Sequence, residues 1–311
     1  YKRQVQSIRA QTLDDWRLIV VDDGSTDDGP ARVQAFDDPR IDIIHQANQG
    51  PGAARNAGLE RATAPYVAFL DADDEWLRDY LKTALAAIQA QDVGFVASMF
   101  IEHPIPYNMP RRWARRGVYP GHYELKGRED PAWADWLLSF PHVGSSVVCT
   151  DAARRYGGFY AQDRCTCGED TVFFIRLGLN ERFRILEQAG TIHHREASHL
   201  SATIAHPLAP FLLDPQIILA YCSEAKEDLA RGLIEHMALR HVWYRARHGR
   251  KAEARELLER VPGARRFRWR YLGCRLAIAT SSLLPYWVRF KVHLGRLRWA
   301  LHRRSRGRSS R

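Results

Sequence analysis

Three aspartates follow an apolar run in the stretch APYVAFLDADDEWL, which covers residues 64–77. These residues, Asp71, Asp73 and Asp74, would repel one another unless a cation lay among them. In an extended strand that ends in Asp71-Ala72-Asp73, residues 71 and 73 point to the same side. Carboxylates on one side suit Mg²⁺ or Mn²⁺, whose coordination a substrate diphosphate and water would complete. The spacing therefore indicates a divalent cation bound with a nucleotide, and the alternative is a solvated turn in which an aspartate caps the next helix.

A second acidic pair, Asp22-Asp23, follows another apolar run, WRLIVV. One cation does not need two further carboxylates, but a carboxylate can also accept hydrogen bonds from a nucleobase or from ribose hydroxyls. Arg55, in GAARNAG, is either a cation for a phosphate or base edge or an exposed helix arginine. These residues are candidates for nucleotide binding.

The elements that must position these residues alternate between strand and helix. Short β-branched and apolar runs predict the strands, and stretches with helical periodicity predict the helices between them. The predicted strands are 17–21, 40–46, 66–74, 93–100 and 144–150, and the predicted helices are 2–9, 30–36, 77–90 and 133–140, with two more that begin near 52 and near 169. Such alternation is typical of an α/β fold whose mostly parallel sheet is covered by helices on both faces. Ligands of these sheets bind beyond the carboxyl ends of the strands, where both acidic clusters lie.

Two other regions are less regular. Residues 102–129 have no clear period and are predicted to form a long loop or an insertion. From Pro207 onward the pattern is helical, with an amphipathic helix pair around Gly249.

Charge is distributed unevenly along the 311 residues, which are enough for one large domain or two ordinary ones. The net charge of the whole chain is +10. Residues 245–311 contain twenty Lys and Arg and three Glu, a net charge of +17, so residues 1–244 carry a net charge of −7. The five cysteines are too few and too irregular for a disulfide framework, which predicts reduced thiols. Cys165 and Cys167 alone do not complete a zinc site. No signal peptide is recognised, and no uninterrupted apolar run approaches the ~18 residues that suggest a membrane span.

Three segments, taken in order, resemble a known family. VVDDGSTDD, NQGPGAARNAGLERATAPYVAFLDADDEW and GGFYAQDRCTCGEDTVFFIRL are similar to the successive motifs of the inverting glycosyltransferases of family 2, and the match covers about residues 1–200. The resemblance implies the GT-A fold, a Rossmann-like α/β arrangement, here followed by a helical C-terminal region. It also implies transfer of a sugar from a nucleotide diphosphate sugar, most simply a UDP-sugar, to a hydroxyl of a glycan or lipid-linked acceptor. Inversion at the anomeric carbon and a need for Mg²⁺ or Mn²⁺ belong to the same expectation.

The resemblance assigns roles to single residues. Asp23, with Asp22 beside it, is expected at the nucleobase or ribose, Arg55 at the nucleotide, and Asp71 at the ribose or donor sugar. Asp73 is expected to bind the metal. Asp170, in GED, is expected to be the general base that deprotonates the acceptor hydroxyl, and Glu169 to tune or orient it. Inverting transfer needs such a base together with charge neutralisation on the leaving diphosphate.

Two departures from the family pattern stand out. The family normally begins with a strand ending in Pro and Tyr-Asn, just before the helix predicted at Lys2, and a sheet without that strand would expose neighbouring edges and lose part of the nucleotide pocket. The activity of a chain without it is therefore in question. The segment TIHHREASHLS replaces an aromatic-Arg-x-His pattern. His193, His194 or Arg195 could approach a metal-bound diphosphate, and the alternative is an ordinary packed or surface histidine. We assign His194 as a second metal ligand.

Three parts of the chain follow from these observations: a GT-A domain over 1–205, a helical region over 206–262 and a basic amphipathic tail over 263–311. The tail interleaves arginines with tryptophan, tyrosine and leucine, which favours an anionic membrane surface over nucleic acid or a solvated terminus. We therefore expect a cytoplasmic protein on the cytoplasmic face of the inner membrane, with no nucleic-acid partner. The alternative hypothesis to an enzyme is a non-catalytic nucleotide- or glycan-binding module derived from a transferase.

Overall fold

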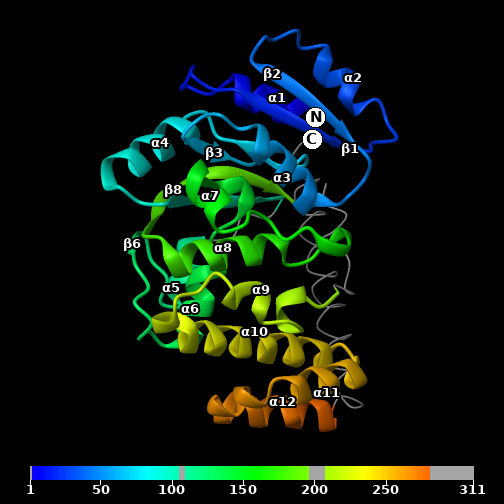
Figure 1. Ribbon diagram of the computed structural model, residues 1–311, viewed down its shortest axis with the longest axis vertical. Coiled ribbons are helices and arrows are strands. Elements are labelled where there is room, and N and C mark those ends of the chain that lie inside the picture. Colours follow the sequence, from blue (N-terminus) through cyan, green and yellow to red (C-terminus); the bar gives the residue numbers. More distant parts are fainter. Residues whose placement is uncertain (1, 105–108, 196–206, 281–311) are drawn as a thin grey trace, which may run out of the picture. The chain divides into compact units, whose positions relative to one another are not determined.

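A computed structural model describes residues 2–104, 109–195 and 207–280 (Figure 1). The chain divides into two compact units, Tyr1–Arg231 and Gly232–Arg311. The predicted boundary at residue 205 lies outside the described residues, and the one at 262 falls within a short 3₁₀ helix, η5 (Pro262–Arg266). Among the described residues, none of the helices combines the length and the hydropathy that a membrane crossing requires.

The strands of the first unit form two sheets. Strands β1 (Leu18–Asp23) and β2 (Ile41–Gln46) pair in parallel from Leu18 opposite Ile41 to Asp23 opposite Gln46. The other sheet has six strands in the order β3-β7-β5-β8-β4, and β6 also pairs with β8. Its members are β3 (Tyr66–Ala68), β4 (Glu75–Trp76), β5 (Phe95–His103), β6 (Gly121–Tyr123), β7 (Ser146–Cys149) and β8 (Phe183–His194).

The two longest pairings, β1 with β2 and β5 with β8, are parallel, as the alternation of elements predicts. The four short pairings, β3 with β7, β5 with β7, β4 with β8 and β6 with β8, are antiparallel. Strand β8 has no counterpart among the predicted strands. Its charged and small residues, in FRILEQAGTIHH, hide the alternation, and its register with β5 shifts between Ser98 and Phe100.

The described helices are α1 (Lys2–Arg9), α2 (Gly29–Gln34), α3 (Pro51–Arg61), α4 (Tyr80–Gln91), α5 (Met109–Ala114), α6 (Pro131–Leu138), α7 (Thr150–Arg155), α8 (Glu169–Asn180), α9 (Gln216–Leu219), α10 (Glu227–Arg247), α11 (Lys251–Arg260) and α12 (Arg268–Thr280). Apart from α5 and α7, which were not predicted, the helices follow the predicted order, and those with predicted bounds begin or end within a few residues of them. The region predicted as an irregular loop contains α5 and β6. The helix pair around Gly249 is confirmed, because α10 ends and α11 begins on either side of it.

Helices cover both faces of the six-stranded sheet. On one face, Ala84 and Ile88 of α4 belong to a buried cluster with Val96 of β5 and Val147 of β7, which Ile8 of α1 joins. The other face is covered by α8, where Phe174 lies 5.9 Å, between ring centroids, from Phe95 of β5, and Phe95 stacks on Phe183 of β8 at 4.6 Å. Consecutive residues of β5 thus face opposite layers, as a strand requires.

One predicted strand is wrong in its extent. The strand begins at Tyr66 as expected but ends at Ala68, and Asp71 to Asp74 form a turn in which the Asp74 amide donates to the Asp71 carbonyl at 3.2 Å. The aspartates are therefore brought together by a turn and not by the alternation of an extended strand. Aspartate favours turns because its side chain can hydrogen-bond to nearby backbone, and here this preference outweighed the apolar pattern.

The approach of α3 to the loop before α8 leaves no room for a side chain at Gly52, and this generates the first prediction. A Cβ there would lie 2.3 Å from the Tyr160 carbonyl oxygen, whereas a Cβ at Gly58 of the same helix would meet Val21 Cγ2 at 3.5 Å. Gly52→Ala should lower the free energy of unfolding by about 1–3 kcal/mol because backbone must move. Gly58→Ala should leave it unchanged or raise it by up to about 1 kcal/mol because alanine favours the helix. Urea unfolding of both variants tests this, and an equal effect of the two substitutions would contradict the described packing.

Candidate functional site

A single arginine connects the two halves of the predicted site. Arg55, on α3, donates from Nη2 to Asp71 Oδ1 at 2.8 Å and from Nη1 to Glu169 Oε1 at 3.0 Å. Its side chain is 16% exposed and its guanidinium lies 5.3 Å from the centre of the Phe159 ring. The turn after β3 and the first residue of α8, 98 positions apart by their residue numbers, are thereby held on one cation.

In this bridge, burial and the neighbouring charges shift the pKa values of the three residues in opposite directions. Burial alone would lower the pKa of Arg55, but the nearby charge of Asp71 and then that of Glu169 raise it above its ordinary value. Burial alone would raise the pKa of Asp71, and Arg55 reverses this so that the net pKa is lowered. For Glu169, burial and the neighbouring Asp170 outweigh Arg55, so its pKa is raised. Arg55 thus holds Asp71 ionised, while Glu169 is the more easily protonated of the two.

The start of α8 positions Asp170. Gly168 precedes the helix in the left-handed conformation (φ 88°), and a Cβ there would lie 2.6 Å from Ala209 Cβ. Asp170 Oδ1 accepts hydrogen bonds from the Thr171 amide at 2.6 Å and from the Thr171 hydroxyl at 3.3 Å. A carboxylate in the first turn is also favoured by the helix dipole. The predicted helix start at Glu169 is confirmed, and Asp170 has one carboxylate oxygen engaged in these bonds.

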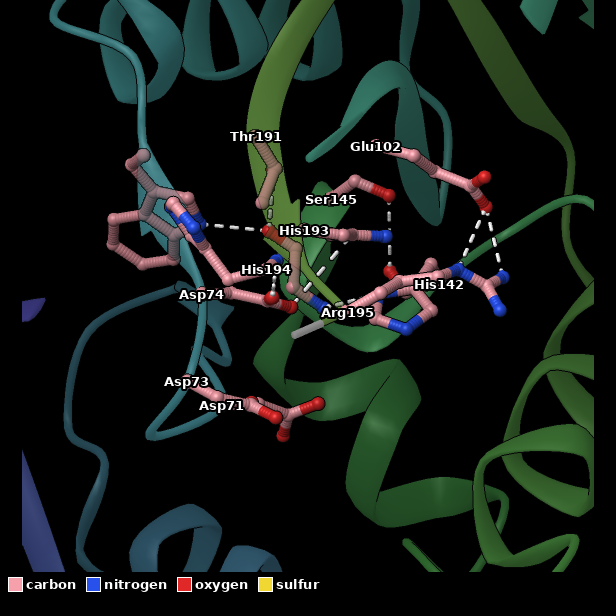
Figure 2. A network of polar contacts seen from close by, with 12 residues as sticks. Asp71, Asp73, Asp74, Glu102, His142, Ser145, Thr191, His193, His194 and Arg195 are labelled. Atoms are coloured by element: carbon pink, nitrogen blue, oxygen red, sulfur yellow. Dashed lines mark hydrogen bonds and ion pairs between the residues drawn. The ribbon is translucent and has the colours of Figure 1, made fainter. Parts of the chain in front are cut away.

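The three aspartates of the opening motif form a compact group. One oxygen from each of Asp71, Asp73 and Asp74 lies within 4.8 Å of the others, and Figure 2 shows Asp71 and Asp73 side by side below Asp74. Burial and the charges of Asp71 and Asp73 raise the pKa of Asp74 to about 7, against the hydrogen bond that Asp74 Oδ1 accepts from the His194 amide at 3.1 Å. The mutual repulsion expected from the sequence is therefore present in the fold.

Two histidines extend the same group from another side. Ligand atoms of Asp74, His142 and His193 also lie within 4.8 Å of one another, and His193 Nε2 is 3.7 Å from Asp74 Oδ2 (Figure 2). The His193 ring stacks on Phe100 at 4.1 Å and lies 4.0 Å from the His142 ring. Burial, followed by the nearby His142, lowers the pKa of His193 to about 2, so its imidazole is neutral at physiological pH. A neutral imidazole nitrogen is a metal ligand.

The segment that carries His142 is held by hydrogen bonds to one carbonyl. Trp76 Nε1 and Thr191 Oγ1 both donate to the Gly144 oxygen, at 2.7 and 2.8 Å, and the Gly144 amide donates to His142 Nδ1 at 3.2 Å. Both donors come from strands that pair with each other, β4 and β8. The histidine is therefore positioned by the sheet.

The aspartate group and the start of α8 border the same space. Burial lowers the pKa of His142, and three carboxylates oppose this shift, those of Asp71, Asp170 and Asp73. Groups that act on one imidazole lie within a short electrostatic range of it. The Arg55 bridge joins Asp71, two residues before Asp73, to Glu169, the neighbour of Asp170.

An open cavity lies beside Asp73. It has a volume of about 500 Å³ and is bordered by the beginnings of α1 and α2, with Lys2, Arg3 and Arg32 among its lining residues. Arg3 Nη2 also donates to the Asp73 carbonyl at 2.6 Å. The lining also includes Asp27 and Asp28, and Arg32 Nε lies 2.9 Å from Asp28 Oδ2, so the cavity presents charges of both signs beside Asp73.

Two predicted nucleotide-binding residues are engaged elsewhere in the chain. Asp23 accepts hydrogen bonds from Gln46 Nε2 and from the amides of Gln49 and Gly50, each at 2.8 Å. Asp22 accepts from the Ser25 amide at 2.9 Å and lies 2.9 Å from His45 Nδ1, and bonds to these two residues lower its pKa. Both aspartates support the loops after β1 and β2, and their contact with a base or ribose stays a prediction.

The structure places His193, and not His194, among the candidate ligands. The His194 ring lies beside Glu75, with Nε2 3.4 Å from Glu75 Oε1, because successive residues of β8 point to opposite faces. His142 was not singled out by the sequence, since it lies in an aperiodic stretch with no motif around it. Of the described cysteines, none belongs to a candidate metal group, and Cys165 Sγ donates to the Cys167 carbonyl at 3.3 Å.

The Arg55 bridge generates a prediction about stability. Arg55→Met should lower the free energy of unfolding at neutral pH by about 1–3 kcal/mol, because it leaves the buried Glu169 and the half-buried Asp71 without their cation. Arg61→Met, on the exposed end of the same helix, should change it by less than about 0.5 kcal/mol. In the Arg55 variant the folded-state pKa values of both acids rise, so the folded state binds protons earlier and the loss should shrink between about pH 7 and about pH 5.

Urea unfolding of both variants across this pH range measures the difference. A loss in Arg55→Met that stays constant or grows as the pH falls would show that the cost is one of packing and not of unpaired carboxylates.

The comparisons with known proteins can be set against this geometry. The family model for glycosyl transferase family 2 matches residues 2–157. An uncharacterised glycosyltransferase, alr2836, of Nostoc sp. is 45% identical over 94 residues, which is 29% of each chain. The putative teichuronic acid biosynthesis glycosyltransferase TuaG of Bacillus subtilis is 39% identical over 29% of this chain and 37% of its own length. The succinoglycan biosynthesis protein ExoW of Rhizobium meliloti is 41% identical over 29% of this chain and 30% of its own length. The match thus spans only about a third of each of these relatives.

Solved structures extend the likeness of fold over more of the chain. The crystal structure of Staphylococcus aureus TarS 1–349 in complex with UDP-GlcNAc has a TM-score of 0.68 and 18% identity, and it covers 91% of this chain and 87% of TarS 1–349. This confirms the predicted GT-A α/β fold. Because the family model matches half of the chain, with the aspartate turn and the Arg55 helix inside the matched segment, the chain belongs to glycosyl transferase family 2.

Proposed function

We propose that the protein transfers a sugar from a nucleotide diphosphate sugar to a hydroxyl of a glycan or lipid-linked acceptor, with inversion and with the help of Mg²⁺ or Mn²⁺. The observation that carries this proposal is the Arg55 bridge, because it brings the aspartate turn and the Glu169-Asp170 pair to one site. A UDP-sugar is the proposed donor, since TarS, which shares the fold, was crystallised with UDP-GlcNAc. The relatives TuaG and ExoW are named for polysaccharide biosynthesis, which supports a glycan-type acceptor.

The residues of the site fit a divalent cation. Oxygen atoms of Asp71, Asp73 and Asp74 converge within 4.8 Å, and the buried Nε2 of His193 has no hydrogen-bond partner within the described part of the chain. Asp73 and Asp74 would hold the ion, with His193 at its edge. When bound, the ion would neutralise charge on the diphosphate as it leaves.

The proposed chemistry needs a base on the acceptor side. Asp170 would take the proton from the acceptor hydroxyl while the new bond forms between that oxygen and the anomeric carbon. The bond from the anomeric carbon to the phosphate oxygen would break on the opposite side, which inverts the configuration. One oxygen of Asp170 is bonded to Thr171, which orients the carboxylate.

Arg55 would serve this chemistry as a positioning residue. Both of its terminal nitrogens already donate to carboxylates, so its contacts support orientation of Asp71 and Glu169 over direct binding of the nucleotide. Glu169 would in turn set the electrostatic surroundings of Asp170, its neighbour in α8. A shift of one carboxylate by about 1 Å can cost on the order of a hundredfold in rate.

The catalytic assignment predicts the effect of two substitutions. Asp73→Asn and Asp170→Asn should each lower kcat/KM by about a hundredfold or more, because the first weakens the metal site and the second removes the base. Asp151→Asn is the matched control, since Asp151 also lies in the first turn of a helix, α7, but is exposed. The measurement is release of nucleoside diphosphate from a set of UDP-, GDP- and dTDP-sugars with Mn²⁺, with and without a chelator.

The non-catalytic alternative gives a different result in the same assay. A binding module would bind a nucleotide sugar in calorimetry but release no diphosphate with any donor. Unchanged turnover in both aspartate variants would contradict the assigned roles, even if the wild-type protein is active.

A further inference from the structure

Helix α12 exposes large apolar side chains along one face. Trp269 is 86% exposed, Leu272 is 51% exposed and Leu276 is 65% exposed. Their spacing of three and four residues places them on a single stripe of the helix. Isolated exposed apolar residues are ordinary on protein surfaces, but a continuous stripe marks an interaction site. We call Trp269, Leu272 and Leu276 the α12 face.

The α12 face is not the side by which the helix packs in its own unit. Cys274, Ala277 and Ile278 are buried, and Cys274 Sγ donates to the Leu239 carbonyl of α10 at 3.4 Å. With 100° between successive residues, these positions lie roughly opposite the exposed stripe. The helix is therefore apolar on two sides, and one of them takes no part in the packing of the described residues of the unit, 232–280.

Helix α10 adds an aromatic residue beside the stripe. A Cβ at Gly273 would meet Trp243 Cζ3 at 3.6 Å, so the Trp243 indole lies against α12 at Gly273. Gly273 directly follows Leu272 of the exposed stripe. Trp243 is itself 43% exposed, and the Arg247 guanidinium lies 5.8 Å from its ring centre. Tryptophan rings beside cationic side chains are typical of segments that lie at the headgroup level of a bilayer.

The charge along helix α12 itself has one sign. Helix α12 contains Arg268, Arg270 and Arg275 and no acidic residue. Residues 261–311 as a whole contain fourteen Lys and Arg and no Asp or Glu. An anionic surface would thus be complementary in charge to this helix. Nucleic acid would use the arginines but gains little from exposed leucines, whereas a lipid surface uses both.

We propose that the α12 face docks on a bilayer that contains anionic lipid. Trp269, Leu272 and Leu276 enter the boundary between headgroups and acyl chains, and Arg268 and Arg275 contact lipid phosphates. The proposal concerns the second unit alone and does not depend on the proposed transferase activity.

Flotation of the full chain with vesicles tests the proposal. The probe is phosphatidylcholine with about a third of phosphatidylglycerol, compared with phosphatidylcholine alone. The wild-type protein should bind the anionic vesicles and lose binding at about 0.5 M salt. The double variant Trp269→Ser and Leu276→Ser should bind at least about tenfold more weakly, because two inserted side chains are lost.

The matched control is Tyr119→Ser with Leu213→Ser, two residues that are 55% and 46% exposed in the first unit. It should bind vesicles as the wild type does. A third variant, Arg268→Gln with Arg275→Gln, should weaken binding to anionic vesicles and reduce its dependence on salt. It keeps the test informative if the first variant unfolds, which circular dichroism will report.

Three outcomes would overturn the proposal. Equal flotation of the wild type and both α12 variants would show that other basic residues carry the binding. Dissociation of a dimer by Trp269→Ser and Leu276→Ser, seen by light scattering without vesicles, would assign the face to a second copy of the chain. A greater loss of binding to duplex DNA than to vesicles would assign it to nucleic acid.

Discussion

The site depends on one buried cation between two acids. Arg55 connects Asp71, in the turn after β3, with Glu169, at the first position of α8, at 2.8 and 3.0 Å. Each of the three groups would be costly to bury alone, and a cation shared by two carboxylates offsets that cost. Because the partners come from three separate segments, the bridge also determines how α3, the aspartate turn and α8 meet. Any rearrangement of one segment would leave a charge unpaired, so the geometry of the site is strongly constrained.

The arrangement separates the properties of neighbouring acids. Arg55 keeps Asp71 ionised. The pKa of Asp74 is raised by burial and then by Asp71 and Asp73, and the pKa of Glu169 is raised by burial and Asp170. A cation placed among the aspartates would relieve the repulsion that raises the pKa of Asp74. The same site thus contains carboxylates that could bind a metal and carboxylates that could hold a proton. Sugar transfer to a hydroxyl would use both.

Much of the fold could be predicted from periodicity, because the helices α1, α3 and α8 and the strands β1, β2 and β5 have strong local patterns. The local pattern failed where tertiary contacts decide the structure. Strand β8 was missed because its residues Glu187, Gln188 and Gly190 do not alternate, although β5 pairs with it along most of its length. The early end of β3 at Ala68 was missed because apolar residues continue to Leu70.

Prediction of the site from the sequence was limited in the same way, by contacts between residues distant in the chain. Arg55, Asp71, Asp73 and Asp170 could be chosen from motifs, since each lies in a recognisable local setting. His142 could not be chosen, and His193 could not be distinguished from His194, because the meeting of His142 and His193 with Asp74 results from strand pairing and from the hydrogen bonds to the Gly144 carbonyl. Sequence also could not show that Asp23 holds a loop or that Arg55 is committed to two carboxylates, since both are facts about partners distant in the chain.

The most direct test of this account is a crystal structure of the protein with Mn²⁺ and uridine diphosphate, with the ion located by its anomalous scattering. We predict an ion that contacts Asp73 and lies within reach of His193, with Arg55 still bound to Asp71 and Glu169. An Arg55 side chain that leaves Glu169 to bind the diphosphate, or an ion remote from Asp73, would contradict the account.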